Sequence, residues 1–128
     1  MTERRVTDGI RIAQLLSSEL DGREDGEFDR FAVVNADPDV EPTDDGARAY
    51  DVTRDGEPFA VVYVQPDRVR VDLSMGLDAA VEAAKAGELR VRPKGTTPPK
   101  TLLFVESGAE VKRATDVFDA ASQAADTE

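Results

Sequence analysis

The sequence predicts an α+β domain in which helices pack on one face of a mostly antiparallel sheet. Apolar residues recur at helical spacing near the start, in the middle and at the end of the chain. Between these segments lie short runs rich in Val, Phe and Tyr, separated by tight-turn dipeptides. The predicted order is α-β-β-β-β-α-β-β-α, a four-strand meander plus one or two further strands with three helices. We expect a single domain over residues 1–128, frayed at 1–5 and at 125–128.

Residues 7–20 are predicted to form the first helix. Thr7 or Asp8 can cap it, because a side-chain oxygen there accepts hydrogen bonds from the free N–H groups of the first turn. Gly22 is expected to end the helix in the left-handed conformation of a C-terminal cap. The apolar stripe of this helix consists of Val6, Ile10, Ala13, Leu16 and Leu20, broadened by Ile12 and Leu15.

The next four apolar runs predict an antiparallel meander. Asp55-Gly56 joins two of them and predicts a type I′ hairpin turn, which needs positive φ at both positions. The run after this turn is apolar on both faces, which places it centrally in the sheet. The last of the four alternates apolar and polar side chains, as expected of a strand with one buried face. The strands are predicted at residues 28–35, 48–54, 58–65 and 68–73.

The remaining third of the chain predicts a helix, two strands and a final helix. Ser74 is expected to cap the first of these helices and Gly87 to end it. The two strands and the loop between them are predicted at residues 89–92, 101–105 and 93–99. Gly108 opens the final helix, and the apolar side of that helix consists of Ala109, Val111, Ala114, Val117, Phe118 and Ala121.

Acidic residues dominate the charge of the chain. It carries 27 Asp and Glu against 16 Lys and Arg, a net charge of −11, and most of the basic residues are arginines. Repulsion among these like charges lowers the stability of the folded chain at low salt. Molar salt relieves the repulsion, because the Debye length falls to about 3 Å at 1 M. The excess of short carboxylates, the few lysines and the absence of cysteine resemble the small acidic proteins of halophilic archaea. The resemblance implies a protein that works in molar salt.

Element order, acidity and length also resemble those of the small acidic chaperones of the type III secretion class. The resemblance concerns the fold rather than particular residues. Those chaperones are homodimers, so it implies self-association.

The chain contains no cysteine and no histidine. Disulfides, thiolate nucleophiles, the commonest general base and the usual ligands of structural zinc are therefore missing. No cofactor and no metal site is predicted. No segment approaches the ~18 consecutive apolar residues of a membrane span, and Asp8 and Arg11 interrupt the stretch where a signal peptide needs its apolar region. We expect a cytoplasmic protein with no membrane partner.

Residues 89–105 carry four basic side chains and no carboxylate. Arginine and lysine neutralise phosphate charge, and the N–H groups and hydroxyls of a Gly-Thr-Thr stretch can hold an anion. The segment is not a P-loop, because its lysine precedes the glycine and Pro98-Pro99 follow where a helix is required. Alternatively, these cations pair with the surrounding acid excess or face carboxylates of a partner. The candidate anion-binding residues are Arg90, Arg92, Lys94, Gly95, Thr96, Thr97 and Lys100.

Three other features are interpreted as structural. The acidic loop at residues 37–45 lacks the glycine and the final glutamate of a calcium-binding EF-hand. Asp51 could serve a nuclease arrangement that pairs an Asp with Glu-x-Lys on the next strand, but residues 59–64 contain neither carboxylate nor lysine. Tyr50 and Tyr63 lie on neighbouring strands and could share a face, where packing is favoured over base stacking.

These observations favour a non-catalytic protein-interaction or regulatory domain adapted to high salt, with another protein or a second copy of the chain as its partner. The alternative is a small anion- or nucleic-acid-binding module that uses residues 90–100. Nucleic acid is the less favoured partner, because high salt weakens phosphate contacts. No catalytic residue is predicted, since carboxylates alone would have to perform the chemistry and no template for them fits.

Overall fold

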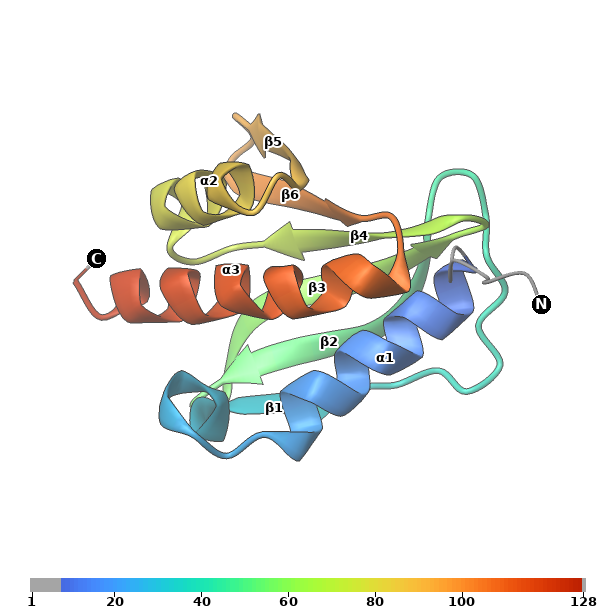
Figure 1. Cartoon of the computed structure of the whole chain (residues 1–128), viewed down its shortest axis with the longest axis horizontal. Helices are drawn as coiled ribbons and strands as arrows, with labels where there is room; N and C mark the ends of the chain where they lie inside the picture. The colour runs from blue at the N-terminus through green and yellow to red at the C-terminus, as the bar shows by residue number, and fades with distance from the viewer. Residues whose placement is uncertain (1–7, 128) are drawn as a thin grey trace.

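The computed structural model describes residues 8–127 and confirms the predicted α+β order. Figure 1 shows three helices on one face of a six-stranded sheet. The helices are α1 (Gly9–Gly22), α2 (Leu77–Ala86) and α3 (Val111–Ala125). The strands are β1 (Phe31–Val34), β2 (Ala47–Arg54), β3 (Glu57–Gln65), β4 (Arg68–Leu73), β5 (Arg90–Lys94) and β6 (Lys100–Val105). Two short 3₁₀ helices, η1 (Gly26–Arg30) and η2 (Gly108–Glu110), precede β1 and α3.

Every pair of neighbouring strands is antiparallel. The strand order is β1-β2-β3-β4-β6-β5, so the first four strands form the predicted meander and β3 lies inside the sheet. β6 takes the place beside β4, and β5 forms an edge. Pro93 suits an edge strand, because proline cannot donate to a hydrogen-bond ladder. The turn at Asp55-Gly56 has φ of 52° and 83°, as the hairpin signal predicted.

The hydrophobic core lies between the sheet and the helices. The inner faces of β3, β4 and β6 contribute fully buried side chains, among them Val62, Val71 and Leu103. α1 adds Leu16 to the same cluster. A group of phenylalanines from η1, β1, β3 and α3 joins it, with ring centroids 5.1 to 5.9 Å apart, as is typical of packed aromatic pairs. These are Phe28, Phe31, Phe59 and Phe118.

Two helix ends differ from expectation. Asp8 caps α1 as predicted, its carboxylate accepting hydrogen bonds from first-turn N–H groups at 2.9 and 3.4 Å. The left-handed cap expected at Gly22 is wrong, because Gly22 is the last helical residue and extended backbone follows it. The cap expected at Ser74 is also wrong. Gly76 precedes α2 in the left-handed conformation, while the Ser74 hydroxyl donates to the carbonyl of Phe59 at 3.0 Å.

Several predicted boundaries shift. The final helix α3 begins at Val111 rather than at Gly108, because residues 108–110 form η2. The first strand begins at Phe31 rather than at Phe28, because residues 26–30 form η1 and the ring of Phe28 packs edge-on against that of Phe31. β5 extends to Lys94, so the loop expected at 93–99 is shortened to residues 95–99.

The predicted frayed ends are described only in part. Residues 1–5 lie outside the described residues. At the other end, α3 runs to Ala125, and Asp126 is ion-paired with Arg30 and Arg54. Within residues 8–127, no helix combines the length and the apolar character needed to cross a membrane.

Candidate anion-binding face

All three described helices lie on the same side of the sheet (Figure 1), and the opposite face presents the side chains that alternate with the core positions. On β4, for example, Arg68, Arg70 and Asp72 alternate with fully buried apolar residues. We call this surface the open face. The central strands contribute Arg48, Asp51, Val61, Tyr63, Arg68, Arg70, Asp72, Leu102 and Phe104 to it.

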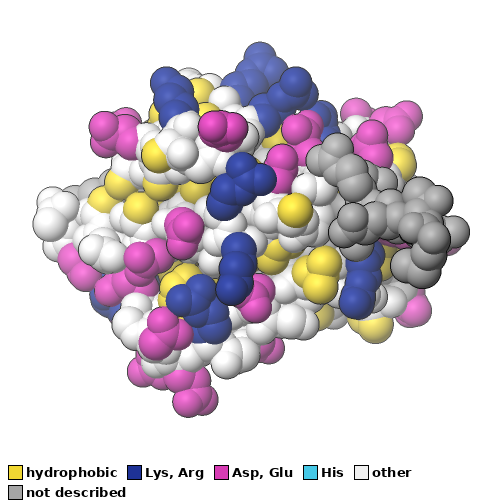
Figure 2. Space-filling view, in the orientation of Figure 1, with side chains coloured by type: hydrophobic (Ala, Val, Ile, Leu, Met, Phe, Trp, Pro, Cys, Tyr) yellow, Lys and Arg dark blue, Asp and Glu magenta, His cyan; other side chains and the backbone are white. Residues whose placement is uncertain are grey.

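The open face also carries the four basic side chains of residues 90–100. Each of the three on β5 lies opposite a β6 residue of the open face. The pairs in register are Arg90 with Phe104, Arg92 with Leu102, and Lys94 with Lys100. Figure 2 looks at the helix side, and there basic side chains gather along the edge where β5 lies in Figure 1.

Few carboxylates face these four cations. Arg90 lies 3.7 Å from Glu106, and the Arg90 side chain is 63% exposed. Within residues 8–127 the structure gives no ion pair for Arg92, Lys94 or Lys100. Pairing with the acid excess therefore does not account for these three cations in the described part of the chain, and their charge is available to a ligand.

The remaining candidate residues lie at the tip of the β5–β6 hairpin rather than on the sheet. Gly95, Thr96 and Thr97 are all exposed. The hydroxyl of Thr96 donates to the carbonyl of Pro98 at 2.8 Å, so it holds the loop together. The structure thus brings the four cations onto one surface and leaves the Gly-Thr-Thr stretch at the rim of that surface.

Three further arginines of the open face were not singled out from the sequence: Arg48, Arg68 and Arg70. Acidic residues stand close to each of them along the chain, so none belongs to a carboxylate-free segment. The alternation of polar and apolar residues over 68–73 is the sequence feature that could have identified Arg68 and Arg70, since it places both on one face of β4. Joining them to β5 requires the pairing of β4 with β6, which skips β5 in sequence order.

Cations and aromatic rings alternate in one row across five strands. From β5 to β2, the residues in register are Arg90, Phe104, Arg70, Tyr63 and Arg48. The guanidinium of Arg70 lies 4.3 Å from the centroid of the Tyr63 ring, and that of Arg68 lies 4.5 Å from the centroid of Phe104. Both distances fall within the ~6 Å range of cation–π attraction, so the rings help to hold these arginines over the sheet.

Tyr50 and Tyr63 do not share a face, which corrects the expectation that they could. β2 has a register shift between Arg48 and Tyr50, where an extra residue turns the following side chain to the opposite side. Tyr50 is buried on the helix side, and its hydroxyl donates to the carbonyl of Ala13 in α1 at 2.8 Å. Burial raises the pKa of Tyr50. Tyr63 remains half-buried on the open face.

In the described part of the chain, three carboxylates lie among the seven basic side chains of the open face, and arginine binds each of them. Asp51 accepts hydrogen bonds from Nε and Nη2 of Arg48 at 2.8 and 2.7 Å, which holds the pKa of Asp51 below its ordinary value. The β2 bulge makes this pair possible, because it places residues three apart on one face. Asp72 accepts from Nε of Arg70 at 2.9 Å. Glu106 lies between two arginines.

The acidic loop, residues 37–45, borders the open face. Nη1 of Arg70 donates to the carbonyl of Asp45 at 3.0 Å, and the side-chain amide of Gln65 donates to the carbonyl of Asp44 at 2.7 Å. These contacts use the loop backbone and leave the carboxylates of both aspartates exposed. Within residues 8–127, no group of three or more Asp, Glu, His or Cys side chains could hold a metal ion.

The whole chain is similar to one described family. Residues 1–128 match the family whose description reads "Family of unknown function (DUF7993)". The chain belongs to this family. No curated protein and no solved structure gives a match. Because membership in DUF7993 names no activity, the function of this chain has to be inferred from the chemistry of its surface.

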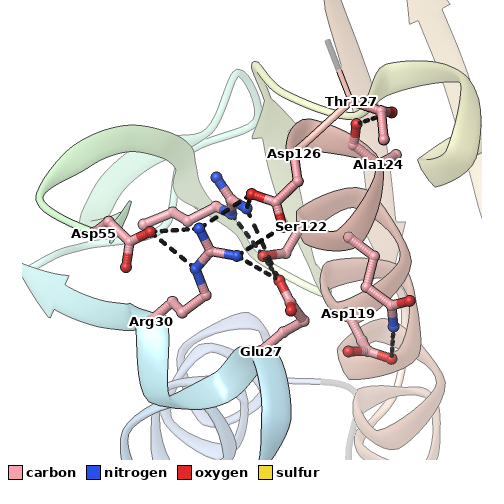
Figure 3. Close-up of polar contacts among 10 residues, drawn as sticks. Glu27, Arg30, Asp55, Asp119, Ser122, Ala124, Asp126 and Thr127 are labelled. Carbon is pink, nitrogen blue, oxygen red and sulfur yellow. Dashed lines mark hydrogen bonds and ion pairs between the residues drawn. The ribbon is translucent and has the colours of Figure 1, made fainter.

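A second polar cluster of this DUF7993 protein lies on the helix side of the sheet (Figure 3). Arg30 of η1 binds Asp55 of the β2–β3 turn at 2.6 Å and Asp126 beyond α3 at 2.9 Å. The buried Arg54 donates to the hydroxyl of Ser122 at 2.7 Å and also binds Asp126. Hydrogen bonds from both arginines lower the pKa of Asp126 to about 2. We interpret this cluster as structural, because its charged groups bind one another and tie three segments together.

Proposed function

We propose that this DUF7993 protein is a non-catalytic binding domain that holds a polyanionic ligand on its open face. One observation carries the proposal. Within residues 8–127, seven basic side chains share one face of the sheet with three carboxylates, although the net charge of the chain is −11. Three of the seven have no ion pair within residues 8–127. The face therefore has the opposite charge to the molecule that carries it.

The spacing of the cations supports a repeating anion as the ligand. Residues two apart on a strand lie about 7 Å apart and point to the same side, so Arg90, Arg92 and Lys94 form an evenly spaced line. Lys100 stands opposite the last of them in register. A chain of charged groups would contact several of these side chains at once, whereas a compact anion would reach one or two.

High salt restricts which of these charges contribute, and we propose that the domain is adapted to it. At 1 M salt the Debye length is about 3 Å, so only cations in direct contact with the ligand add to affinity. Arginine suits this condition, because its planar guanidinium can bind a phosphate or a carboxylate through two hydrogen bonds. Five of the seven cations of the open face are arginines.

The carboxylates of the open face support a binding role rather than a catalytic one. A general acid needs a raised pKa, whereas the pKa of Asp51 is lowered by its hydrogen bonds to Arg48. Asp72 accepts a hydrogen bond from Nε of Arg70 at 2.9 Å. These carboxylates therefore serve to orient arginine side chains.

A titration with inorganic polyphosphate tests the proposal. We expect the wild-type protein to bind it with an affinity that falls linearly with salt on a double-logarithmic plot. The variant Arg92→Gln/Lys94→Gln/Lys100→Gln removes the unpaired cations and should weaken binding at least about tenfold, with the slope of the plot reduced by about 2 to 3. Circular dichroism at each salt concentration verifies that the variant is folded.

The matched control is Arg11→Gln/Lys85→Gln/Lys112→Gln, which makes the same change in net charge on exposed positions of α1, α2 and α3. It should bind polyphosphate as tightly as the wild type. If both triple variants lose the same affinity, net charge rather than the open face governs binding and the proposal is wrong.

A protein-interaction domain is the second candidate, and the apolar part of the open face favours it. Val34, Val61 and Leu102 are only partly buried there. The partner would be another protein or a second copy of the chain. A symmetric face-to-face dimer would bring two basic faces together, so an acidic protein fits better than self-association. Sizing chromatography in molar KCl, over a range of protein concentrations, distinguishes these two partners. A second copy gives an apparent mass that rises with concentration, whereas an acidic partner leaves the isolated chain a monomer.

A further inference from the structure

The open face presents flat ring systems as well as positive charge. Tyr63 and Phe104 lie in one row two strands apart, about 10 Å from each other given the spacing of neighbouring strands. Arg70 stands between them, and Arg48 and Arg90 stand beyond them. A ligand such as polyphosphate would contact the cations and make no stacking contact with either ring.

We propose that the open face binds a single-stranded nucleic acid, with bases stacked over Tyr63 and Phe104 and phosphates along the cations of β5. This inference rests on the proposed function, because it names the polyanion. The bases of a single strand are free of a partner strand, and they offer π-faces to aromatic and guanidinium planes. Since every base has such a face, binding tolerates different sequences.

The charges of the open face determine which side of the ligand lies along β5 and which side lies over the inner strands. Arg92, Lys94 and Lys100, which have no ion pair within residues 8–127, lie at the β5–β6 edge, whereas Asp51 and Asp72 lie further in, on β2 and β4. Phosphates are attracted most strongly to this edge, because Arg48 and Arg70 further in already bind these carboxylates. The backbone of the ligand therefore follows β5, and its bases extend inward over the rings.

The two β4 arginines are preorganised for contact with bases. The guanidinium of Arg68 lies over the ring of Phe104, and that of Arg70 lies over the ring of Tyr63. Their side chains are 28% and 23% exposed, so each is partly ordered before a ligand binds. Groups that are already ordered lose less conformational entropy on binding. A base can then stack on the guanidinium or displace it from the ring.

A duplex matches the same surface less well. Its bases are stacked on one another, and their edges are reached from the grooves by a helix or a narrow β-ribbon. A broad sheet face can touch only its phosphates, so no base would stack on the rings. Competition between a single strand and a duplex of the same sequence therefore separates stacking from charge.

Tyrosine fluorescence reads out the stacking directly, because the chain has two tyrosines and no tryptophan. The probe is oligo-deoxythymidine of about 12 nucleotides, within the usual site sizes for single strands. Stacking on Tyr63 should quench its emission, while the buried Tyr50 on the other side of the sheet does not respond. Tyr63→Phe keeps a ring, so it should retain affinity for a labelled oligonucleotide and lose the ligand-dependent quenching.

The variant Tyr63→Leu/Phe104→Leu keeps apolar bulk and removes both rings. Its affinity for the oligonucleotide should fall at least about tenfold. Its affinity for polyphosphate should fall much less, because Arg92, Lys94 and Lys100 at the β5–β6 edge keep their charges. Leu102→Val is the matched control, because it changes an apolar side chain of the same face without altering a ring. It should bind both probes like the wild type.

The outcomes distinguish this inference from the proposed function. The inference is overturned if the double leucine variant keeps its affinity for the oligonucleotide, or if the duplex competes as well as the single strand. It is also overturned if polyphosphate or an acidic protein binds and the oligonucleotide does not. In each case, weaker polyphosphate binding by the triple glutamine variant leaves the proposed function standing. If that variant binds polyphosphate like the wild type, the proposed function itself fails.

Discussion

At the scale of single residues, arginine organises both charged regions of the molecule. On the open face Arg68 and Arg70 lie over aromatic rings, and in the cluster of Figure 3 Arg30 and Arg54 each bind more than one oxygen group. Both uses need a flat group with several donors in a fixed plane, which the ammonium of lysine does not provide. The preference for arginine in the composition therefore has a structural counterpart in these contacts.

Asp126 should make the free energy of unfolding depend on pH, and the variant Asp126→Asn tests this prediction. The folded pKa of Asp126 is about 2, against an ordinary value of 3.8, because Arg30 and Arg54 stabilise its ionised form. A depressed pKa contributes stability that is complete above about pH 4 and is lost as the pH falls through about 2. We expect denaturation curves to show a less stable variant at neutral pH, with the difference from wild type vanishing near pH 2.

Asp116→Asn is the control for this effect, because Asp116 is exposed on α3, the helix that Asp126 follows, and has no ion pair within residues 8–127. It should lie close to the wild type at every pH. Stability differences for Asp126→Asn that stay constant from neutral to acid pH would show that the ion pairs of Figure 3 do not act through the charge of Asp126.

At the scale of elements, the sequence predicted what periodicity determines and missed what packing determines. The meander and the three helices follow from spacing two and spacing near four, and they lie where expected. The β2 bulge before Tyr50 cannot be recognised in the apolar pattern. Its extra residue, Ala49, is apolar like the residues of a regular strand, so nothing in the sequence distinguishes it. Without the bulge Tyr50 would face outward, so the error about the two tyrosines comes from a single inserted position.

The candidate site was also predictable in part: the sequence indicates which cations share a strand face, but not which strands lie side by side. The spacing of Arg90, Arg92 and Lys94 predicts a shared face once they form a strand. Their association with Arg68 and Arg70 depends on β6 lying between β4 and β5. That order is set by the competition of two strands for an inner position. β6 is the more apolar of the two, and the exposed β5 contains proline, which suits an edge.

Gly76→Ala tests how closely α2 is held against α3. Gly76 precedes α2 with φ of 59°, and a β-carbon there would overlap the carbonyl oxygen of Ala121 in α3. The left-handed conformation alone costs alanine about 1 to 2 kcal/mol, and the overlap adds to it. We expect a loss of at least about 2 kcal/mol in the free energy of unfolding measured by denaturant.

The control for Gly76→Ala is Gly22→Ala at the end of α1, where a β-carbon would meet nothing within 4 Å. Alanine is the better helix former, so this variant should be neutral or up to about 1 kcal/mol more stable. Equal effects of the two substitutions would mean that the contact between α2 and α3 gives way at little cost.

At the scale of the whole molecule, the two signs of charge are unevenly distributed. Among residues 8–127, the open face holds seven basic and three acidic side chains, against 16 and 27 in the whole sequence. The acid excess therefore lies elsewhere, and Figure 2 shows acidic side chains scattered over the helix side. Like charges at close spacing raise the free energy of the folded state, and the acidic loop beside the open face concentrates them. Salt should relieve this repulsion without changing the core.

The thermal midpoint should accordingly rise as KCl increases from ~0.1 to ~2 M, because screening removes repulsion first and salt exclusion from the surface then strengthens apolar burial. Neutralising the exposed loop residues in Asp39→Asn/Glu41→Gln/Asp45→Asn separates the two causes. This variant should melt above the wild type at ~0.1 M and converge with it by ~1 M, where the Debye length is only about 3 Å. Calorimetry in a KCl series measures both. A midpoint that stays flat for the wild type would contradict adaptation to high salt, and a gap between the two proteins that persists at ~2 M would show that the loop acts on stability through something other than charge.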